Sequence, residues 1–187
     1  RRLRFVPLGG ALVEVTCRTL HGTFLLSPSP TVNEIILGTL GRAQRMYGVR
    51  CCAFAFLSNH FHLLLEVHDA RQLARFMGYL NSNLAREMGR IAQWRERFWS
   101  QRYQAALISG EEAAQIGRLK YVLAQGCKEG LVDRPQDWPG VHASRALLGL
   151  ETLQGTWIDR TQQNIARRAK RSFEDQDFAT PEFVQLS

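Results

Sequence analysis

Two histidines in an apolar segment have residue types and a spacing that suit a metal site. His60 and His62 lie two positions apart in AFAFLSNHFHLLLEV. This apolar run predicts a buried strand, in which side chains alternate between faces, so both imidazoles lie on one face and Phe61 on the other. Neutral imidazoles bind divalent metals. A buried histidine pair can also be a hydrogen-bonded part of the core, and both interpretations stay open on this stretch alone.

A phenol and a side-chain amide share a face further along the chain. Tyr121 and Gln125 lie four residues apart in LKYVLAQGCK, which we expect to be helical, so one turn separates them. A phenol becomes a nucleophile when its proton is removed. An amide oxygen can bind a hard cation. A helical tyrosine is far more often structural than catalytic, so this pair gains weight only from its context.

The charge balance favours an anionic partner. The 187 residues carry 24 Lys and Arg against 17 Asp and Glu, a formal net charge of +7. We therefore expect nucleic acid before a membrane as the partner, although excess positive charge also serves solubility. In WRERFWSQRY, arginines alternate with aromatic residues. This segment is either a nucleic-acid groove with stacking surfaces or a set of core aromatics with solvated arginines.

The composition also indicates the compartment. No stretch is long and apolar enough to span a bilayer, and the chain does not open with a secretory signal, so we expect a cytoplasmic protein. The four cysteines form no CxxC pair, and we expect them to be reduced thiols packed in the fold. They are Cys17, Cys51, Cys52 and Cys127.

Apolar periodicity and turn residues predict alternating strands and helices. The expected strands are residues 11–18, 49–57, 61–67 and 102–108. Three helices are expected. The first begins at a Thr31 or Asn33 cap and ends at Gly48, the second begins after an Asp69 cap, and the third runs from Glu111 to about Lys128. This order indicates an α/β (α+β) sandwich of the ferredoxin-like type, with a single antiparallel sheet and helices packed on it. We expect residues 1–140 to form the catalytic domain and residues 141–187 a C-terminal extension, helical or partly mobile.

Four segments in this order resemble those of the REP-associated tyrosine transposases, a bacterial branch of the single-tyrosine HUH transposases. They are PLGGALVEVTCR, FLSNHFHLLLEV, RFWSQRYQAALI, and LKYVLAQGCKEGLV with WPG behind it. Together they extend from Arg4 to about Gly140. The HUH motif alone is short, and the four-part pattern is more specific.

The resemblance implies roles for the residues considered above. His60 and His62 would be the HUH histidines that bind a divalent metal, Mg²⁺ or Mn²⁺, and Gln125 would be a third ligand. Tyr121 would attack single-stranded or hairpin DNA by transesterification and form a 5′-phosphotyrosine. Two departures from the family are Gln125-Gly126 in place of a common Asn-Pro, and Leu57-Ser58-Asn59 in place of a common Met-Pro-Asn.

The basic residues near these motifs are the expected phosphate contacts. They are Arg18, Arg97, Arg102, Arg118 and Lys120. Whether the protein acts as a monomer or a homodimer stays open. Two other functions remain as alternatives: a domesticated relative that binds DNA hairpins with little cleavage, and a ferredoxin-like module that binds a metal or a small molecule.

Overall fold

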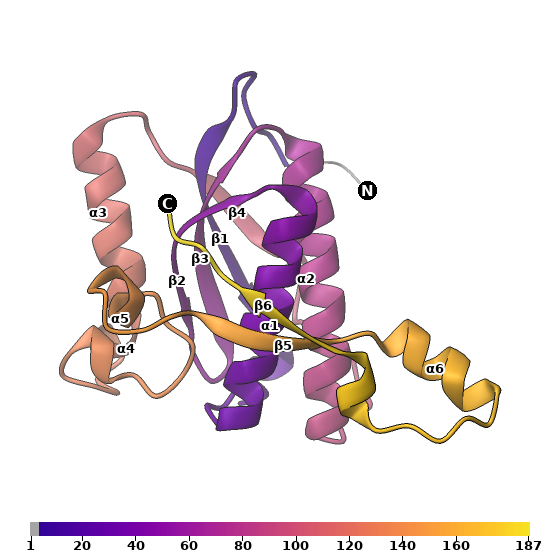
Figure 1. Ribbon diagram of the computed structural model, residues 1–187. Coiled ribbons are helices and arrows are strands. Elements are labelled where there is room, and N and C mark those ends of the chain that lie inside the picture. Colours follow the sequence, from indigo (N-terminus) through magenta and orange to yellow (C-terminus); the bar gives the residue numbers. More distant parts are fainter. Residues whose placement is uncertain (1–3) are drawn as a thin grey trace.

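Four strands form one antiparallel sheet in the order β2-β3-β1-β4 in the computed structural model, which describes residues 4–187 (Figure 1). The strands are β1 (Ala11–Arg18), β2 (Arg50–Phe56), β3 (His60–Val67) and β4 (Gln104–Leu107). With the two helices between them, the elements follow the β-α-β-β-α-β order of a ferredoxin-like sandwich. The structure therefore confirms the predicted fold class.

Two long helices cover one face of this sheet: α1 (Pro30–Tyr47) and α2 (Ala70–Ile91). The predicted cap of α2 is confirmed, because the Asp69 carboxylate accepts the amides of Arg71 and Gln72. The predicted start of α1 is wrong. Ser29 is its cap, because Pro30 needs no amide partner and fits the first helical position.

The other face of the sheet carries α3 (Glu112–Leu123), which contacts β2 and β3 (Figure 1). A short helix, α4 (Gln125–Lys128), follows it, and Gly130 ends the region with a φ of 67°. The sequence predicts one continuous helix from Glu111 to Lys128. The structure breaks it at Ala124, whose ψ of 3° departs from helical values.

Residues 141–187, expected as a helical or partly mobile extension, also contain two strands. Their elements are α5 (Ser144–Leu147), β5 (Gln154–Ile158), α6 (Arg160–Arg168) and β6 (Ala179–Phe183). Strands β5 and β6 pair as an antiparallel ribbon that crosses α1 (Figure 1). Each strand has only five residues and β6 contains Pro181, so the sequence carries little strand signal here. Short 3-10 turns complete the chain: η1 (Leu20–Gly22), η2 (Pro135–Asp137) and η3 (Asp175–Phe178).

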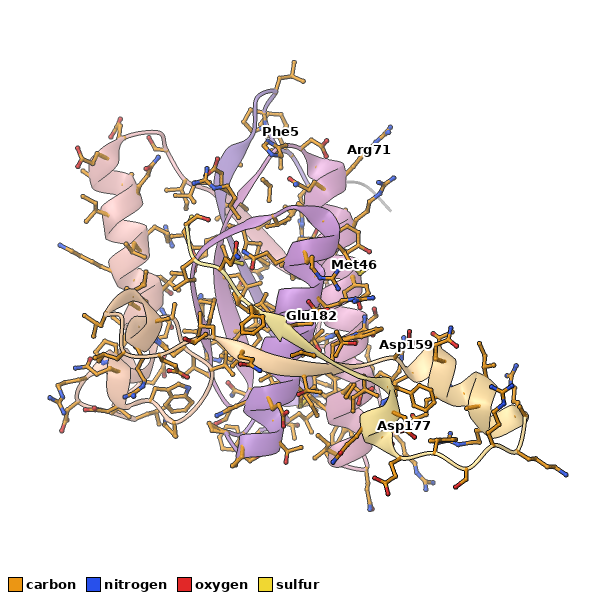
Figure 2. The ribbon with its side chains drawn as sticks, viewed as in Figure 1. Phe5, Met46, Arg71, Asp159, Asp177 and Glu182 are labelled. Carbon is orange, nitrogen blue, oxygen red and sulfur yellow. The ribbon has the colours of Figure 1, made fainter. Side chains whose placement is uncertain are left out.

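Two glycines of α1, Gly38 and Gly41, and one carboxylate of β6 fasten the ribbon to α1. A side chain at Gly38 would collide with the backbone of Thr156, so the absence of a Cβ lets the ribbon lie directly on the helix. The carboxylate of Glu182, which is labelled in Figure 2, is 3.0 Å from Arg42 and 2.7 Å from Arg45 of α1. The C-terminal extension is therefore packed against the first crossover helix.

The edge of β2 that does not pair with β3 is covered by residues 138–143, which we call the strap. The amide of Phe56 donates to the carbonyl of Val141, and the amide of Ala143 donates to the carbonyl of Phe54. The Trp138 indole adds a bond of 2.9 Å to the carbonyl of Phe56. Pairing of this kind protects a sheet edge from association with other chains.

Two further expectations concern the cysteines and the membrane. All four cysteines are free thiols, as predicted, and burial raises the pKa of Cys17 and of Cys51 to about 12. Within residues 4–187, no helix is both long enough and apolar enough to cross a bilayer.

A candidate catalytic pocket on the open face of the sheet

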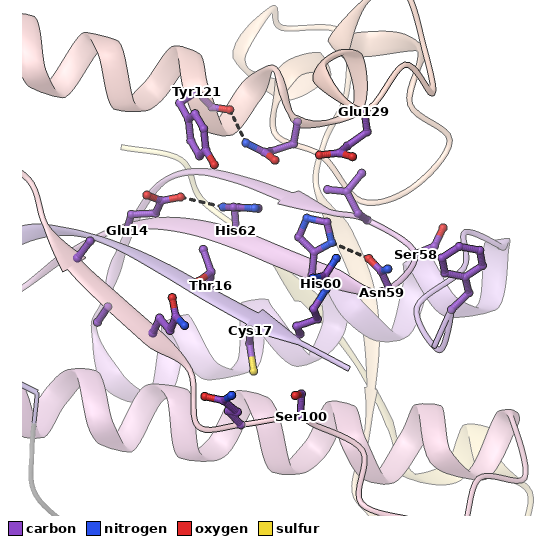
Figure 3. A pocket seen from close by; sticks show the side chains of 18 of the residues that line it. Glu14, Thr16, Cys17, Ser58, Asn59, His60, His62, Ser100, Tyr121 and Glu129 are labelled. Carbon is purple, nitrogen blue, oxygen red and sulfur yellow. Dashed lines mark hydrogen bonds and ion pairs between the residues drawn. The ribbon is translucent and has the colours of Figure 1, made fainter. Parts of the chain in front are cut away.

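A cavity of about 910 Å³ lies between the sheet and the helices α3 and α4 (Figure 3). Its lining includes His60, His62, Tyr121 and Gln125, the four residues singled out from the sequence. The cavity is on the face opposite α1 and α2. Strands β1, β3 and β4, the helical region that carries the tyrosine and several loops therefore contribute to one pocket.

The alternation of side chains along β3 places the two histidines side by side on one face. In the pairing of β1 with β3, Arg18 lies opposite His60 and Thr16 opposite His62. The two imidazole ring centroids are 5.3 Å apart. The predicted common face is confirmed, because Phe61 between them points into the core and is fully buried.

Glu14 of β1 connects His62 to the tyrosine helix. One carboxylate oxygen lies 2.8 Å from Nδ1 of His62, and the other lies 2.6 Å from a guanidinium nitrogen of Arg118 on α3. Only 5% of Glu14 is exposed. Burial raises the pKa of Glu14, but the bonds and charges of His62 and Arg118 outweigh that effect, so its pKa is lowered. Glu14 is thus a buried, ionised partner of both elements.

Asn59 has the corresponding role for His60. Its amide nitrogen donates to the carbonyl of Gly22, which turns Oδ1 toward His60 at 2.6 Å from Nδ1. Burial lowers the pKa of His60 to about 4, and His62 and Arg18 act in the same direction, while Glu129 opposes them. His60 is therefore neutral at physiological pH.

The Tyr121 ring faces the histidines from α3. Its centroid lies 5.8 Å from that of His62 (Figure 3). Two cations lie over the same ring, the Arg118 guanidinium at 5.2 Å and the Lys128 ammonium at 4.7 Å. All of these residues belong to one chain, so a single polypeptide brings the phenol and both imidazoles together.

The donor atoms left over in the pocket suit a divalent cation. Because Asn59 Oδ1 and the Glu14 carboxylate are acceptors, Nδ1 of each histidine carries a proton, and Nε2 is the ring nitrogen left to bind a metal. A metal-binding histidine usually donates its other nitrogen to such a partner. Gln125, only 2% exposed, donates its amide nitrogen to the carbonyl of Tyr121 at 2.9 Å and keeps its amide oxygen free. The residues present fit the expected metal, although no cluster of three His, Cys, Asp or Glu forms in the described part of the chain.

The expected phosphate contacts have different positions. Arg18 and Arg102 line the pocket. Arg118 borders it through its ion pair with Glu14. Lys120 and Arg97 are exposed outside the pocket lining, and Arg97 donates to the carbonyl of Trp99.

Sequence reasoning missed three polar residues of the pocket that interact with the histidines: Glu14, Asn59 and Glu129. A signal existed for the first, because ALVEVTCR places a carboxylate inside an otherwise apolar strand, and a buried charge needs partners. Asn59 follows the expected turn and precedes His60 directly. Glu129 lies four residues after Gln125. If the helix expected from Glu111 is continued by one residue, Glu129 shares a face with Gln125 and Tyr121.

Comparison with known families is consistent with this arrangement. Residues 28–125 match the model of a family described as transposase IS200-like, which is a class of DNA-processing enzymes. The match includes both histidines, the tyrosine and the glutamine, and covers more than half of the 187 residues. The chain belongs to this IS200-like transposase family.

The fold is similar to that of a solved structure. A REP-associated tyrosine transposase bound to a REP hairpin is 16% identical, with a TM-score of 0.63, over 81% of this chain and 87% of that chain. A protein of Deinococcus radiodurans assigned as a transposase is 17% identical, with a TM-score of 0.45, over 65% of this chain and 96% of that chain. No curated protein matches the sequence. The family match thus confirms the resemblance to a transposase family that the four segments indicated.

Proposed function

We propose that this transposase is a metal-dependent endonuclease and strand transferase that acts on single-stranded or hairpin DNA through Tyr121. The observation that carries the proposal is the position of the Tyr121 ring, 5.8 Å from the ring of His62 in a pocket shared with His60. Two imidazoles, an amide oxygen and a phenol in one cavity are groups that can support phosphodiester transesterification.

The proposed reaction exchanges one ester bond for another. The phenol oxygen of Tyr121 loses its proton and attacks phosphorus, the bond from phosphorus to the 3′ oxygen breaks, and that oxygen takes up a proton. The products are a 5′-phosphotyrosine and a free 3′-hydroxyl. Because the ester bond is conserved on the enzyme, the strand can be rejoined without an external energy source.

His60, His62 and Gln125 would hold the cation, Mg²⁺ or Mn²⁺. When bound, such a cation neutralises charge on the scissile phosphate. Imidazole nitrogens favour Mn²⁺ over Mg²⁺, which prefers oxygen ligands. Glu14 and Asn59 fix the two rings so that each Nε2 remains available.

The substrate class follows from charge and access. The net charge of +7 and the pocket arginines Arg18 and Arg102 favour a polyanion. A tyrosine on a packed helix reaches an unpaired strand more readily than a base-paired duplex. The structurally similar REP-associated tyrosine transposase is bound to a REP hairpin. We therefore assign hairpin or single-stranded DNA to this pocket.

A covalent trapping experiment tests the proposal. Incubation with a single-stranded hairpin DNA and Mn²⁺ should give an adduct that survives denaturation. Tyr121→Phe should abolish it, and chelation of the metal should do the same. Tyr47→Phe is the matched control, because Tyr47 lies on α1, on the other face of the sheet. An adduct that persists in Tyr121→Phe would refute the assignment, and hairpin binding with no adduct in the wild type would favour a DNA-binding role without cleavage.

A further inference from the structure

A second basic site lies outside the catalytic pocket, where α2 ends. Three arginines surround a shallow hollow of about 570 Å³ there. The lining residues are Ala85, Arg86, Gly89, Arg90, Gln93, Trp94 and Arg95. None of them belongs to the pocket that holds His60 and His62.

A reversal of the chain builds this hollow. Gln93 adopts a left-handed conformation with a φ of 50°, and the amide of Trp94 then donates to the carbonyl of Gly89 at 2.7 Å. The chain therefore folds back on the last turn of the helix. This reversal places Trp94 and Arg95 beside Arg86, which comes from two turns earlier in α2.

Two of the three arginines in the hollow lack a carboxylate partner in the described part of the chain. Arg86 and Arg95 are exposed, and neither forms an ion pair or a side-chain hydrogen bond within residues 4–187. Arg90 lies 2.7 Å from Glu87, whose carboxylate is also 2.8 Å from Arg160. Glu96 is exposed next to Arg95. Arg160 also lies 3.1 Å from Asp175, so three carboxylates stand against the three arginines of the hollow and Arg160.

The following segment leads from the hollow to the catalytic pocket. Residues 95–102 run beside the end of β1, where the amide of Ser100 donates to the carbonyl of Arg18 at 2.8 Å. Ser100 and Arg102 line the catalytic pocket, and the exposed Arg97 lies between them and the hollow along the chain. Basic residues therefore occur in the chain segment that connects the two sites.

We propose that this hollow is a second DNA site, which binds the backbone phosphates of the single strand that flanks the segment held in the catalytic pocket. The inference rests on the proposed function. Guanidinium groups suit phosphate oxygens, and Trp94 offers an aromatic surface for an unpaired base. The site would add affinity for longer DNA and would leave the chemistry at Tyr121 unchanged.

Binding measurements with two DNA lengths test this site. One probe is a hairpin alone, and the other is the same hairpin with a single-stranded flank of about ten nucleotides. In the double variant Arg86→Ala and Arg95→Ala, we expect about a tenfold weaker affinity for the flanked hairpin and no change for the short one. The slope of log affinity against log salt for the flanked hairpin should fall by about 1.4, since each lost single-strand phosphate contact contributes about 0.7.

The matched control is the double variant Arg71→Ala and Arg75→Ala. It removes the same charge from exposed positions at the other end of the same helix, where Figure 2 labels Arg71. The control should bind both probes like the wild type. An equal loss of affinity in the control variant, or an equal loss for both probes, would show that only the total charge matters. Either result would overturn the second site.

The adduct assay separates this inference from the proposed function. The variant Arg86→Ala and Arg95→Ala should still form the Tyr121 adduct with the short hairpin. If the wild type forms that adduct but the variant binds flanked DNA normally, only the second site is refuted. If the wild type binds neither probe, both proposals fail.

Discussion

At the scale of single residues, Glu14 has the most connected position in the pocket. Its two oxygens bond to different elements, His62 on β3 and Arg118 on α3. The first bond selects the tautomer of His62 that leaves Nε2 free. The second ties the helix of Tyr121 to the sheet. One buried carboxylate therefore orients a proposed metal ligand and also holds the proposed nucleophile near it.

Glu14→Gln should weaken both functions. The neutral amide cannot accept from His62 and Arg118 with two oxygens, and we expect metal affinity or activity to fall by about 10- to 100-fold, the usual effect of losing such a partner. The measurement is the Mn²⁺ dependence of adduct formation, with direct Mn²⁺ titration beside it. Glu66→Gln on β3 is the control, because Glu66 is half exposed and pairs with Arg50 outside the pocket. Equal Mn²⁺ dependence in Glu14→Gln and wild type would refute the role.

The sequence predicted part of this site because part of it is local. The spacing of His60 and His62 on a strand, and of Tyr121 and Gln125 one turn apart, depends only on secondary structure. Their approach to one another was implied by the family resemblance, not by the spacing. Glu14 could not be placed because its partners lie 48 and 104 residues away.

At the scale of elements, the ribbon of β5 and β6 depends on a close approach to α1. Gly38→Ala should destabilise the protein, although alanine favours helices by about 1 kcal/mol, because the new Cβ would meet the backbone of Thr156. We expect a net loss of about 1–3 kcal/mol, typical of overpacking. Gly78→Ala on α2 is the control, since nothing lies within 4 Å of a Cβ there. Chemical unfolding measures both, and a stabilised Gly38→Ala protein would contradict the packing.

The attachment of this ribbon should also depend on pH. Burial raises the pKa of Glu182, but its bonds to Arg45 and Arg42 outweigh that effect, so the pKa is lowered on folding. A lowered pKa stabilises the folded state above the unfolded value of 4.5, and this stabilisation disappears as the pH falls through the folded pKa. Glu182→Gln should cost about 1–3 kcal/mol at pH 7 and much less in strong acid.

The free energy of unfolding between pH 7 and pH 2 checks this expectation. The wild type should lose stability on acidification more steeply than Glu182→Gln. Parallel curves for the two proteins would show that the carboxylate contributes nothing through its charge.

The ribbon also shows where sequence patterns stop being informative. Strands β1, β2 and β3 were predicted to within one residue at most ends because they are long, apolar and bounded by turn residues. The ribbon consists of five-residue strands whose stability comes from contacts with α1. The two glycines at positions 38 and 41 of that helix were the only local sign of a close partner, and they do not identify it.

At the scale of the whole molecule, the sheet separates structural helices from the chemistry. Helices α1 and α2 cover one face, and the pocket with α3 occupies the other. The strap holds the edge of β2 next to α3, and Gly126 packs against Trp138 of the strap. The tyrosine helix is therefore fastened to the same chain that supplies the histidines.

A mixing experiment tests whether one chain is sufficient. The variants His62→Ala and Tyr121→Phe should each be inactive in adduct formation, and a mixture of the two should remain inactive, because each intact pocket needs both residues from one chain. Recovery of adduct in the mixture would show that the tyrosine acts on the histidines of another subunit. The wild type diluted to the same active concentration is the control.

The central claim is that the phenol of Tyr121 becomes joined to DNA. The most direct measurement is mass spectrometry of the trapped complex after digestion with a nuclease and trypsin. We predict that a nucleotide remains attached through phosphate to Tyr121 in the peptide YVLAQGCK, and that this peptide is unmodified without a divalent metal. A nucleotide attached to any other residue, or an unmodified peptide in a metal-dependent cleavage reaction, would contradict the account.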